Sequence, residues 1–204
     1  MQAAVIGVFV ALDFVVFYIF WELTLVPLFF IVNLWGGGAN RAHASYKFFI
    51  YTHVASLVML LGIFGLFYTA LNQTGVPTFD IRELIAQFQF FEPGLMKDGI
   101  FLAILFGFLA KLPAFPFHSW LPDAYSEAPP TAGSILFILL KIGGYGLFRI
   151  SLPPMLPNTG SPQLMIMILG LLGSVSILYG ALLALRQKDL KRMIAYSSLS
   201  HMAT

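Results

Sequence analysis

The chain has 204 residues, of which 59% are hydrophobic and only 10% charged, and its formal net charge is +2. Its mean hydropathy of +0.86 excludes a water-soluble domain, which needs more charged surface, and so small a net charge does not favour nucleic-acid binding. The absence of cysteine excludes disulfides, iron–sulfur clusters held by this chain, cysteine-ligated zinc and thiol nucleophiles.

Apolar stretches long enough to cross a membrane recur along the chain. A spanning helix needs about 20 apolar residues. The segments that meet this length are residues 14–35, 48–70, 99–125, 131–150 and 163–185. Residues 1–12 and the stretch after residue 190 are helical in pattern but too short to span. The sequence therefore predicts an all-α fold, a polytopic transmembrane helix bundle. Residues 1–204 form a single membrane domain, interpreted as a fragment with about five full spans and partial helices at both ends.

Lysine and arginine in the short turns predict the orientation of the helices. Arg41 and Lys47 precede the second span, and the turn at residues 186–192 follows the fifth. Alternating crossings place these two turns on one side of the membrane, and their positive charge predicts that this side is the cytoplasm. The longer link at residues 71–97 then lies on the opposite side. Within it, "FDIRELIAQFQFF" is amphipathic and is expected to lie along the interface.

Three ionisable residues, Glu22, Lys111 and Lys141, fall at membrane depth. A charge at the centre of a spanning helix costs about 2.5–3.5 kcal/mol on insertion scales, so these residues should face protein or water. An internal salt bridge that only locks helices together is the structural alternative, but one glutamate cannot neutralise two lysines. Burial disfavours the charged form of lysine and a nearby carboxylate favours it. A lysine between these effects can gain or lose a proton when its partner moves, as a proton relay requires.

The stretch "GIFLAILFGFLAKLPAFPFHSWLPDAY" places prolines directly after the buried lysine. Pro113 and Pro116 remove backbone donors and break the helix. Broken backbone inside a membrane is tolerated where it is buried in protein or lines a water-filled cavity. In "KIGGYG", which follows Lys141, Gly143 and Gly146 are interpreted as packing glycines.

The four histidines give weaker signals. His118 lies just beyond the proline break, where an imidazole with an unperturbed pKa near 6.5 suits proton passage. His53, near the start of the second span, is expected to have a hydrogen-bonded structural role, and His43 has no evident task. His201 falls in the last, incomplete helix. No pair of histidines has the spacing of metal ligands, so no metal site is predicted.

Four motifs in order resemble one protein family over essentially the whole chain. They are "FYIFWELTLVPLFFIVNLWGG", "AKLPAFPFHSWLPDAYSEAPPTAGS", "LLKIGGYGLFR" and "LRQKDLKRMIAYSSLSHM". Together they resemble the NADH:quinone oxidoreductase chain 4 family, the antiporter-like, proton-translocating membrane subunit of respiratory complex I. Members have about fourteen spans built as two inverted repeats. The resemblance thus implies part of an inverted-repeat antiporter-like fold: the first repeat and the opening of the second.

The resemblance also implies roles for particular residues. The glutamate of the W-E-L motif, Glu22, pairs in that family with the lysine before the broken helix, Lys111. Lys141 corresponds to the central relay lysine, His118 to a histidine towards the cytoplasmic access path, and His201 to a histidine on the polar axis. Only the resemblance supports His201.

The function implied is that of a non-redox subunit of a proton-translocating NADH:quinone oxidoreductase, an integral membrane protein of a bacterial plasma membrane. No cofactor is expected in this chain, whereas NADH, FMN, iron–sulfur clusters and quinone are expected in the rest of the complex. The expected partners are other membrane-arm subunits and the lipid bilayer, not nucleic acid, and the chain is not expected to act as a monomer. An Mrp-type sodium/proton antiporter subunit and a membrane-bound hydrogenase arm are close alternatives. A structural membrane-arm subunit with non-pumping ion pairs is the alternative from a different class.

Overall fold

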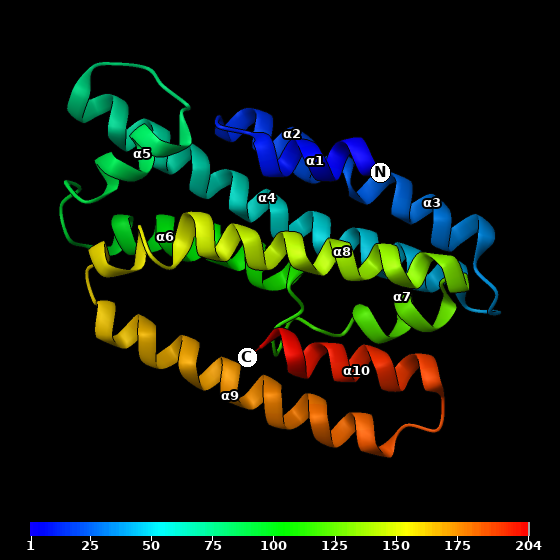
Figure 1. Ribbon diagram of the computed structural model, residues 1–204. Coiled ribbons are helices and arrows are strands. Elements are labelled where there is room, and N and C mark those ends of the chain that lie inside the picture. The colour runs from blue at the N-terminus through cyan, green and yellow to red at the C-terminus, as the bar shows by residue number, and fades with distance from the viewer. Residues whose placement is uncertain (204) are drawn as a thin grey trace.

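The computed structural model describes residues 1–203, with the side chains at positions 131 and 134 left aside. Within these residues the fold is a bundle of helices (Figure 1), which confirms the predicted class. The elements are α1 (Gln2–Val10), α2 (Phe14–Leu23), α3 (Leu25–Trp35), α4 (Arg41–Thr74), α5 (Ile81–Phe88), α6 (Leu95–Lys111), α7 (Leu121–Glu127), α8 (Pro130–Gly146), η1 (Leu147–Ser151), η2 (Leu156–Asn158), α9 (Pro162–Arg186) and α10 (Leu190–Met202).

Within the part of the chain that the structure describes, three helical segments are both long and apolar enough to cross a membrane: Phe14–Trp35, Arg41–Thr74 and Pro162–Arg186. They coincide with the first, second and fifth predicted spans. The helices of the third and fourth predicted spans, α6 and α8, have 17 residues each. α6 is shortened by the proline break, and α8 continues directly into the π-helical turn η1.

The broken helix is held by side chains that replace the lost backbone bonds. α6 ends at Lys111, and α7 begins ten residues later at Leu121. The indole Nε1 of Trp120 donates to the carbonyl of Ala110 at 2.9 Å, which satisfies an acceptor at the end of α6. The backbone N–H of Phe115 donates to Oγ of Ser176, a buried residue of α9, at 2.8 Å. The break is therefore an ordered part of the fold.

One end of the bundle is closed by contacts between loops. A single antiparallel bridge joins Asp13 and Asp80, and each aspartate also caps the helix that follows it, α2 or α5. The Arg82 guanidinium and nearby backbone N–H groups hold the pKa of Asp80 below its usual range. The apolar face of α5, with Leu84 and Phe88, is buried against the protein core. The amphipathic pattern predicted there therefore reflects packing on the bundle.

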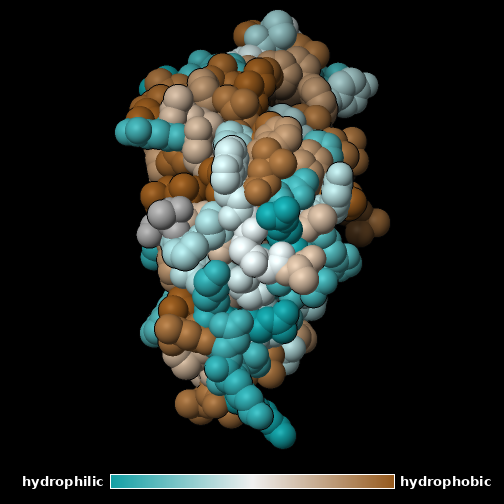
Figure 2. Space-filling model, turned by 90° about the vertical axis from the view of Figure 1, so that its right-hand side faces the viewer, coloured by the Kyte–Doolittle hydropathy of each residue, from teal (hydrophilic) through white to brown (hydrophobic). Residues whose placement is uncertain are grey.

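The opposite end carries most of the basic turns. The turn before α4 and the turn between α9 and α10 lie together at the right of Figure 1, and the α4–α5 link lies at the left. This agrees with the predicted shared side of the two basic turns. Viewed from that end, hydrophilic residues gather down the middle of the surface, with hydrophobic residues around them (Figure 2).

Glycines allow α4, α6 and α8 to pack closely around the break. A Cβ on Gly107 of α6 would lie 2.5 Å from Cβ of Met59 on α4. A Cβ on Gly143 of α8 would lie 2.9 Å from the backbone nitrogen of Leu112, next to Lys111. Small residues permit such approach between membrane helices. The packing interpretation of Gly143 is therefore confirmed.

We expect Gly107→Ala to destabilise the protein by about 1–3 kcal/mol, because the new methyl group overpacks the contact between α4 and α6. Gly99→Ala on the same helix is the matched control, because a Cβ there has nothing within 4 Å. The midpoint of thermal denaturation of the detergent-solubilised protein measures both. Equal midpoints for the two variants would contradict the close helix contact.

Candidate functional site

A local break between α2 and α3 creates an acceptor site inside the first span. α2 ends at Leu23 and α3 begins at Leu25, with Thr24 between them. Pro27 has no N–H to donate to the preceding turn. Within the break, the hydroxyl of Thr24 donates to the carbonyl of Trp21 at 2.7 Å. The carbonyl of Trp21 and the Thr24 hydroxyl thus lie side by side as oxygen acceptors.

Lys111 fills this acceptor site. Its side chain is buried, with only 2% of the residue exposed. Nζ donates to the carbonyl of Trp21 at 3.0 Å and to Oγ1 of Thr24 at 2.8 Å. It also lies 4.0 Å from the centroid of the Trp21 ring, in a cation–π contact. Two neutral oxygens and an aromatic face therefore surround the ammonium group.

Glu22 has a different partner. Its Oε2 lies 2.7 Å from Nδ1 of His53 on α4, while its Oε1 is buried without a hydrogen-bond partner. Among the described residues, Glu22 and Lys111 form no direct ion pair. The direct contact expected from the family resemblance is thus absent from this arrangement. The hydrogen bond expected for His53 is present.

Helix geometry explains the difference. Consecutive residues of a helix point about 100° apart and do not share a face. Trp21 points into the core towards Lys111, with 1% of the residue exposed. Glu22 therefore points away from Trp21 and towards α4.

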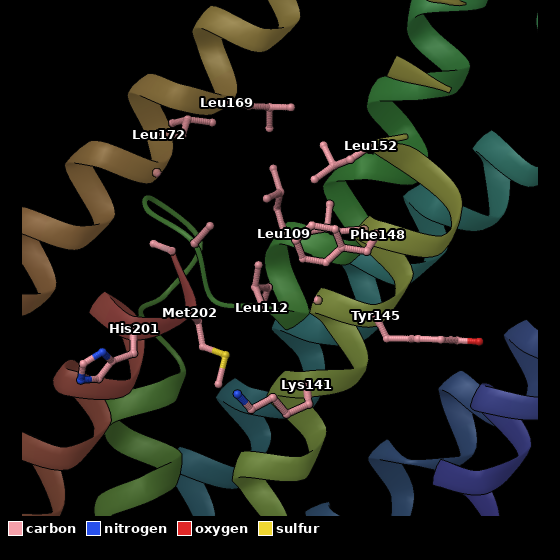
Figure 3. A pocket seen from close by; sticks show the side chains of 15 residues that line it. Leu109, Leu112, Lys141, Tyr145, Phe148, Leu152, Leu169, Leu172, His201 and Met202 are labelled. Atoms are coloured by element: carbon pink, nitrogen blue, oxygen red, sulfur yellow. The ribbon is translucent and has the colours of Figure 1, made fainter. Parts of the chain in front are cut away.

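Lys141 and His201 line a cavity of about 500 Å³ between α6, α8 and the α9–α10 hairpin. Figure 3 shows the Lys141 amine directed towards Met202, with the His201 ring on the far side of Met202 and with Phe148 and leucines along the rest of the wall. Leu112, the residue after Lys111, also lines this cavity. Lys141 has no hydrogen-bond or ion-pair partner among the described residues. The structure thus places Lys141 and His201 at one cavity adjoining the helix that ends at Lys111.

His118 lies in the segment between α6 and α7. Its ring stacks on Phe115, with centroids 5.7 Å apart, and meets Tyr179 of α9 edge-on at 5.0 Å. Its Nδ1 is buried without a partner in the described part of the chain. In the chain, His118 follows the end of α6 at Lys111 and precedes α7, which begins at Leu121.

A cluster of ion pairs at that end ties three helices together. Asp123 of α7 binds Lys47 of α4 at 2.7 Å through Oδ2 and Arg192 of α10 at 3.3 Å through Oδ1. Lys191 donates to the carbonyl of Ala128 at 2.8 Å. These contacts fix the base of the broken helix against its neighbours.

Sequence reasoning did not single out Thr24 or Asp123. Thr24 could have been noticed as a hydroxyl two residues after a membrane glutamate and three before a proline. Asp123 offers no such signal, because its two basic partners lie far away in sequence. No cluster of three or more possible metal ligands occurs among the described residues, and no feature of the site favours a bound cofactor.

The geometry defines a polytopic membrane protein with a buried lysine at a broken helix. The chain belongs to the family described as NADH:quinone oxidoreductase/Mrp antiporter, transmembrane, which it matches over residues 11–204. This confirms the family resemblance seen in the motifs.

Several relatives are close. The chain is 98% identical over 202 residues to F(420)H(2) dehydrogenase subunit M of Methanosarcina mazei, covering 99% of this chain and 40% of that protein. It is 45% identical over 208 residues to NADH-quinone oxidoreductase subunit M of Escherichia coli K12, covering 97% and 39% respectively. The chain therefore spans about two fifths of the length of these relatives.

Solved structures share the fold. A chain of respiratory complex I from Thermus thermophilus with bound NADH matches with a TM-score of 0.83 at 36% identity, covering 99% of this chain and 41% of that one. A chain of the archaeal membrane-bound sulfane sulfur reductase matches with a TM-score of 0.84 at 24% identity, covering 98% and 39%. The second likeness concerns the fold alone.

We expect Asp123→Asn to lower the free energy of unfolding by about 0.5–1 kcal/mol, because it weakens the ion pairs that join α4, α7 and α10. The effect is small because the ion pairs of Asp123 are partly exposed. Glu92→Gln makes the same charge change at an exposed position without an ion pair in the described structure. The thermal midpoint of the solubilised protein should fall for Asp123→Asn relative to Glu92→Gln. An equal fall of the thermal midpoint in both variants would mean that the change in net charge, and not the loss of the Asp123 ion pairs, lowers the stability.

Proposed function

We propose that this chain is the antiporter-like, proton-translocating membrane subunit of a dehydrogenase complex and that it carries no redox chemistry itself. The observation that carries the proposal is Lys111, a lysine buried to 2% exposure at a helix break. Among the described residues, the groups that contact its ammonium directly are neutral. Desolvation disfavours the charged amine and neighbouring oxygens favour it, so small movements of nearby charge can transfer its proton.

The proposed route uses the site residues in order. His118, at the access side of the break, supplies the titratable step towards the end predicted to be cytoplasmic. Lys111 holds the proton inside the bundle, and the Glu22 charge sets how firmly it is held. Lys141 receives the proton across the contact between α6 and α8, and His201 lies beyond it at the same cavity. Lys141 lies at the cavity wall without a hydrogen-bond or ion-pair partner among the described residues, and this supports the relay role over a structural salt bridge.

Electron transfer takes place in other subunits under this proposal. The related proteins are named F(420)H(2) dehydrogenase subunit M and NADH-quinone oxidoreductase subunit M, and the redox cofactors and quinone belong to other subunits of the complex. Given 98% identity to the first relative, we propose F(420)H(2) as the electron donor of the complex. Other membrane-arm subunits are the proposed partners, and the chain acts as a subunit of a translocating enzyme.

The donor is tested in membranes that contain the native complex. We expect F(420)H(2) to drive electron transfer coupled to acidification across the vesicle membrane, and NADH to drive little. Faster coupled transfer with NADH would contradict the donor assignment and leave the relay proposal standing.

The relay is tested by Lys111→Ala in the full-length subunit within the intact complex. We expect proton translocation per electron to fall to a small fraction of the wild-type ratio, because the buried amine is lost. Vesicle acidification and electron transfer, recorded in parallel, give this ratio.

Lys97→Met is the matched control. Lys97 is also buried on α6, with 4% exposure, but it donates to the carbonyls of Gln89 and Phe91 beyond the end of α5. Its loss should lower stability and leave the proton-to-electron ratio intact. A normal ratio in Lys111→Ala would return Lys111 to a structural role.

A further inference from the structure

Among the described residues, the Lys111 ammonium and the Glu22 carboxylate each have hydrogen-bonding capacity that is not used. An ammonium group has three N–H donors, and the described residues provide Lys111 with two acceptors, the Trp21 carbonyl and the Thr24 hydroxyl. A carboxylate has two oxygens, and Oε1 of Glu22 is buried without a donor. A direct contact between Lys111 and Glu22 would supply both missing bonds.

His53 holds the carboxylate out of that contact. An ionised carboxylate can only accept hydrogen bonds, so Nδ1 of His53 carries the proton donated to Oε2 across 2.7 Å. The imidazole stacks on Phe49, one turn earlier on α4, with centroids 5.6 Å apart and planes 16° apart. This stacking fixes the ring orientation that Glu22 meets.

An ordinary interhelical hydrogen bond explains these contacts less well. A bond whose only role is to join α2 to α4 would leave the carboxylate satisfied, because unpaired buried polar atoms cost free energy. Among the described residues, the buried Oε1 of Glu22 has no donor, while the Lys111 ammonium donates to two acceptors and has no third. The arrangement therefore leaves a strong alternative contact unused.

We propose that His53 is a positioning residue that competes with Lys111 for Glu22. In the arrangement seen here, His53 holds Glu22 and the Thr24 site holds Lys111. In the alternative arrangement, Glu22 turns to Lys111 and His53 is released. His53 thereby sets how often Lys111 is without a direct counter-charge. This inference rests on the proposed function, because it concerns the same lysine.

The experiment uses the intact complex with substitutions in the full-length subunit, assayed for protons translocated per electron. We expect His53→Leu to lower this ratio several-fold, because Glu22 then stays on Lys111 and pins its proton. His53→Gln, whose amide can donate to the carboxylate, should restore much of the ratio. His43→Leu, an exposed histidine of the same helix, should leave it unchanged.

Epistasis separates positioning from structural support. If His53 acts through Glu22, His53→Leu should have no further effect in the Glu22→Gln background, because the competing carboxylate charge is already gone. Losses that add in the double variant would overturn the proposal. A wild-type ratio in His53→Leu alongside a loss in Glu22→Gln would also overturn it.

Thr24 gives an independent test from the lysine side. Thr24→Val removes one acceptor of Lys111 and should drive the ammonium to Glu22, with the same several-fold loss as His53→Leu. Thr24→Ser keeps the hydroxyl and should recover much of the ratio that Thr24→Val loses. If the complex with His53→Leu does not assemble, Thr24→Val and Thr24→Ser test the proposed competition for Glu22. A normal proton-to-electron ratio in Thr24→Val overturns the proposal.

The same measurements distinguish failure of the proposed proton relay from failure of the proposed role of His53. A normal ratio in both Lys111→Ala and Glu22→Gln would remove the relay itself, whereas a loss in these two with a normal ratio in His53→Leu removes only the role of His53.

Discussion

The need to surround one buried ammonium with oxygen atoms organises the centre of this molecule. A charged amine removed from water is costly unless acceptors replace the lost hydration. Two irregular backbones meet that need: α2 gives way to α3 at Thr24, and α6 ends at Lys111 before its prolines. The first break presents the acceptors and the second presents the lysine. The two helix breaks are therefore complementary, because one provides the acceptors and the other the ammonium that they bind.

Close packing makes the irregular centre tolerable. Gly107 brings α4 against α6, and Gly143 brings α8 against the residue after Lys111. The indole of Trp120 and the hydroxyl of Ser176 satisfy backbone groups released at the break. At the base, Asp123 joins α4, α7 and α10. The lysine is consequently enclosed on one side by packed helices, while α6 borders the cavity of Lys141 on the other.

The distribution of charge has a consequence for proton movement. A permanent ion pair between a glutamate and a lysine would stabilise both charges and resist transfer. Here the carboxylate has an imidazole partner and the ammonium has neutral partners, so the two charges act on one another without being locked.

The membrane environment, the helical class, the proline break and the family follow from the sequence alone, because hydropathy, proline chemistry and motif order are local properties of the chain. The sequence also marks Lys111, Glu22 and Lys141 as charges that need an explanation, because a charge at membrane depth is costly. Their partners, in contrast, depend on the fold. The direction of each side chain on α2 depends on helix phase, so Trp21 meets Lys111 while Glu22 meets His53. Likewise, Lys47, Asp123 and Arg192 come together only because α4, α7 and α10 converge at one end, a long-range contact that no local pattern encodes.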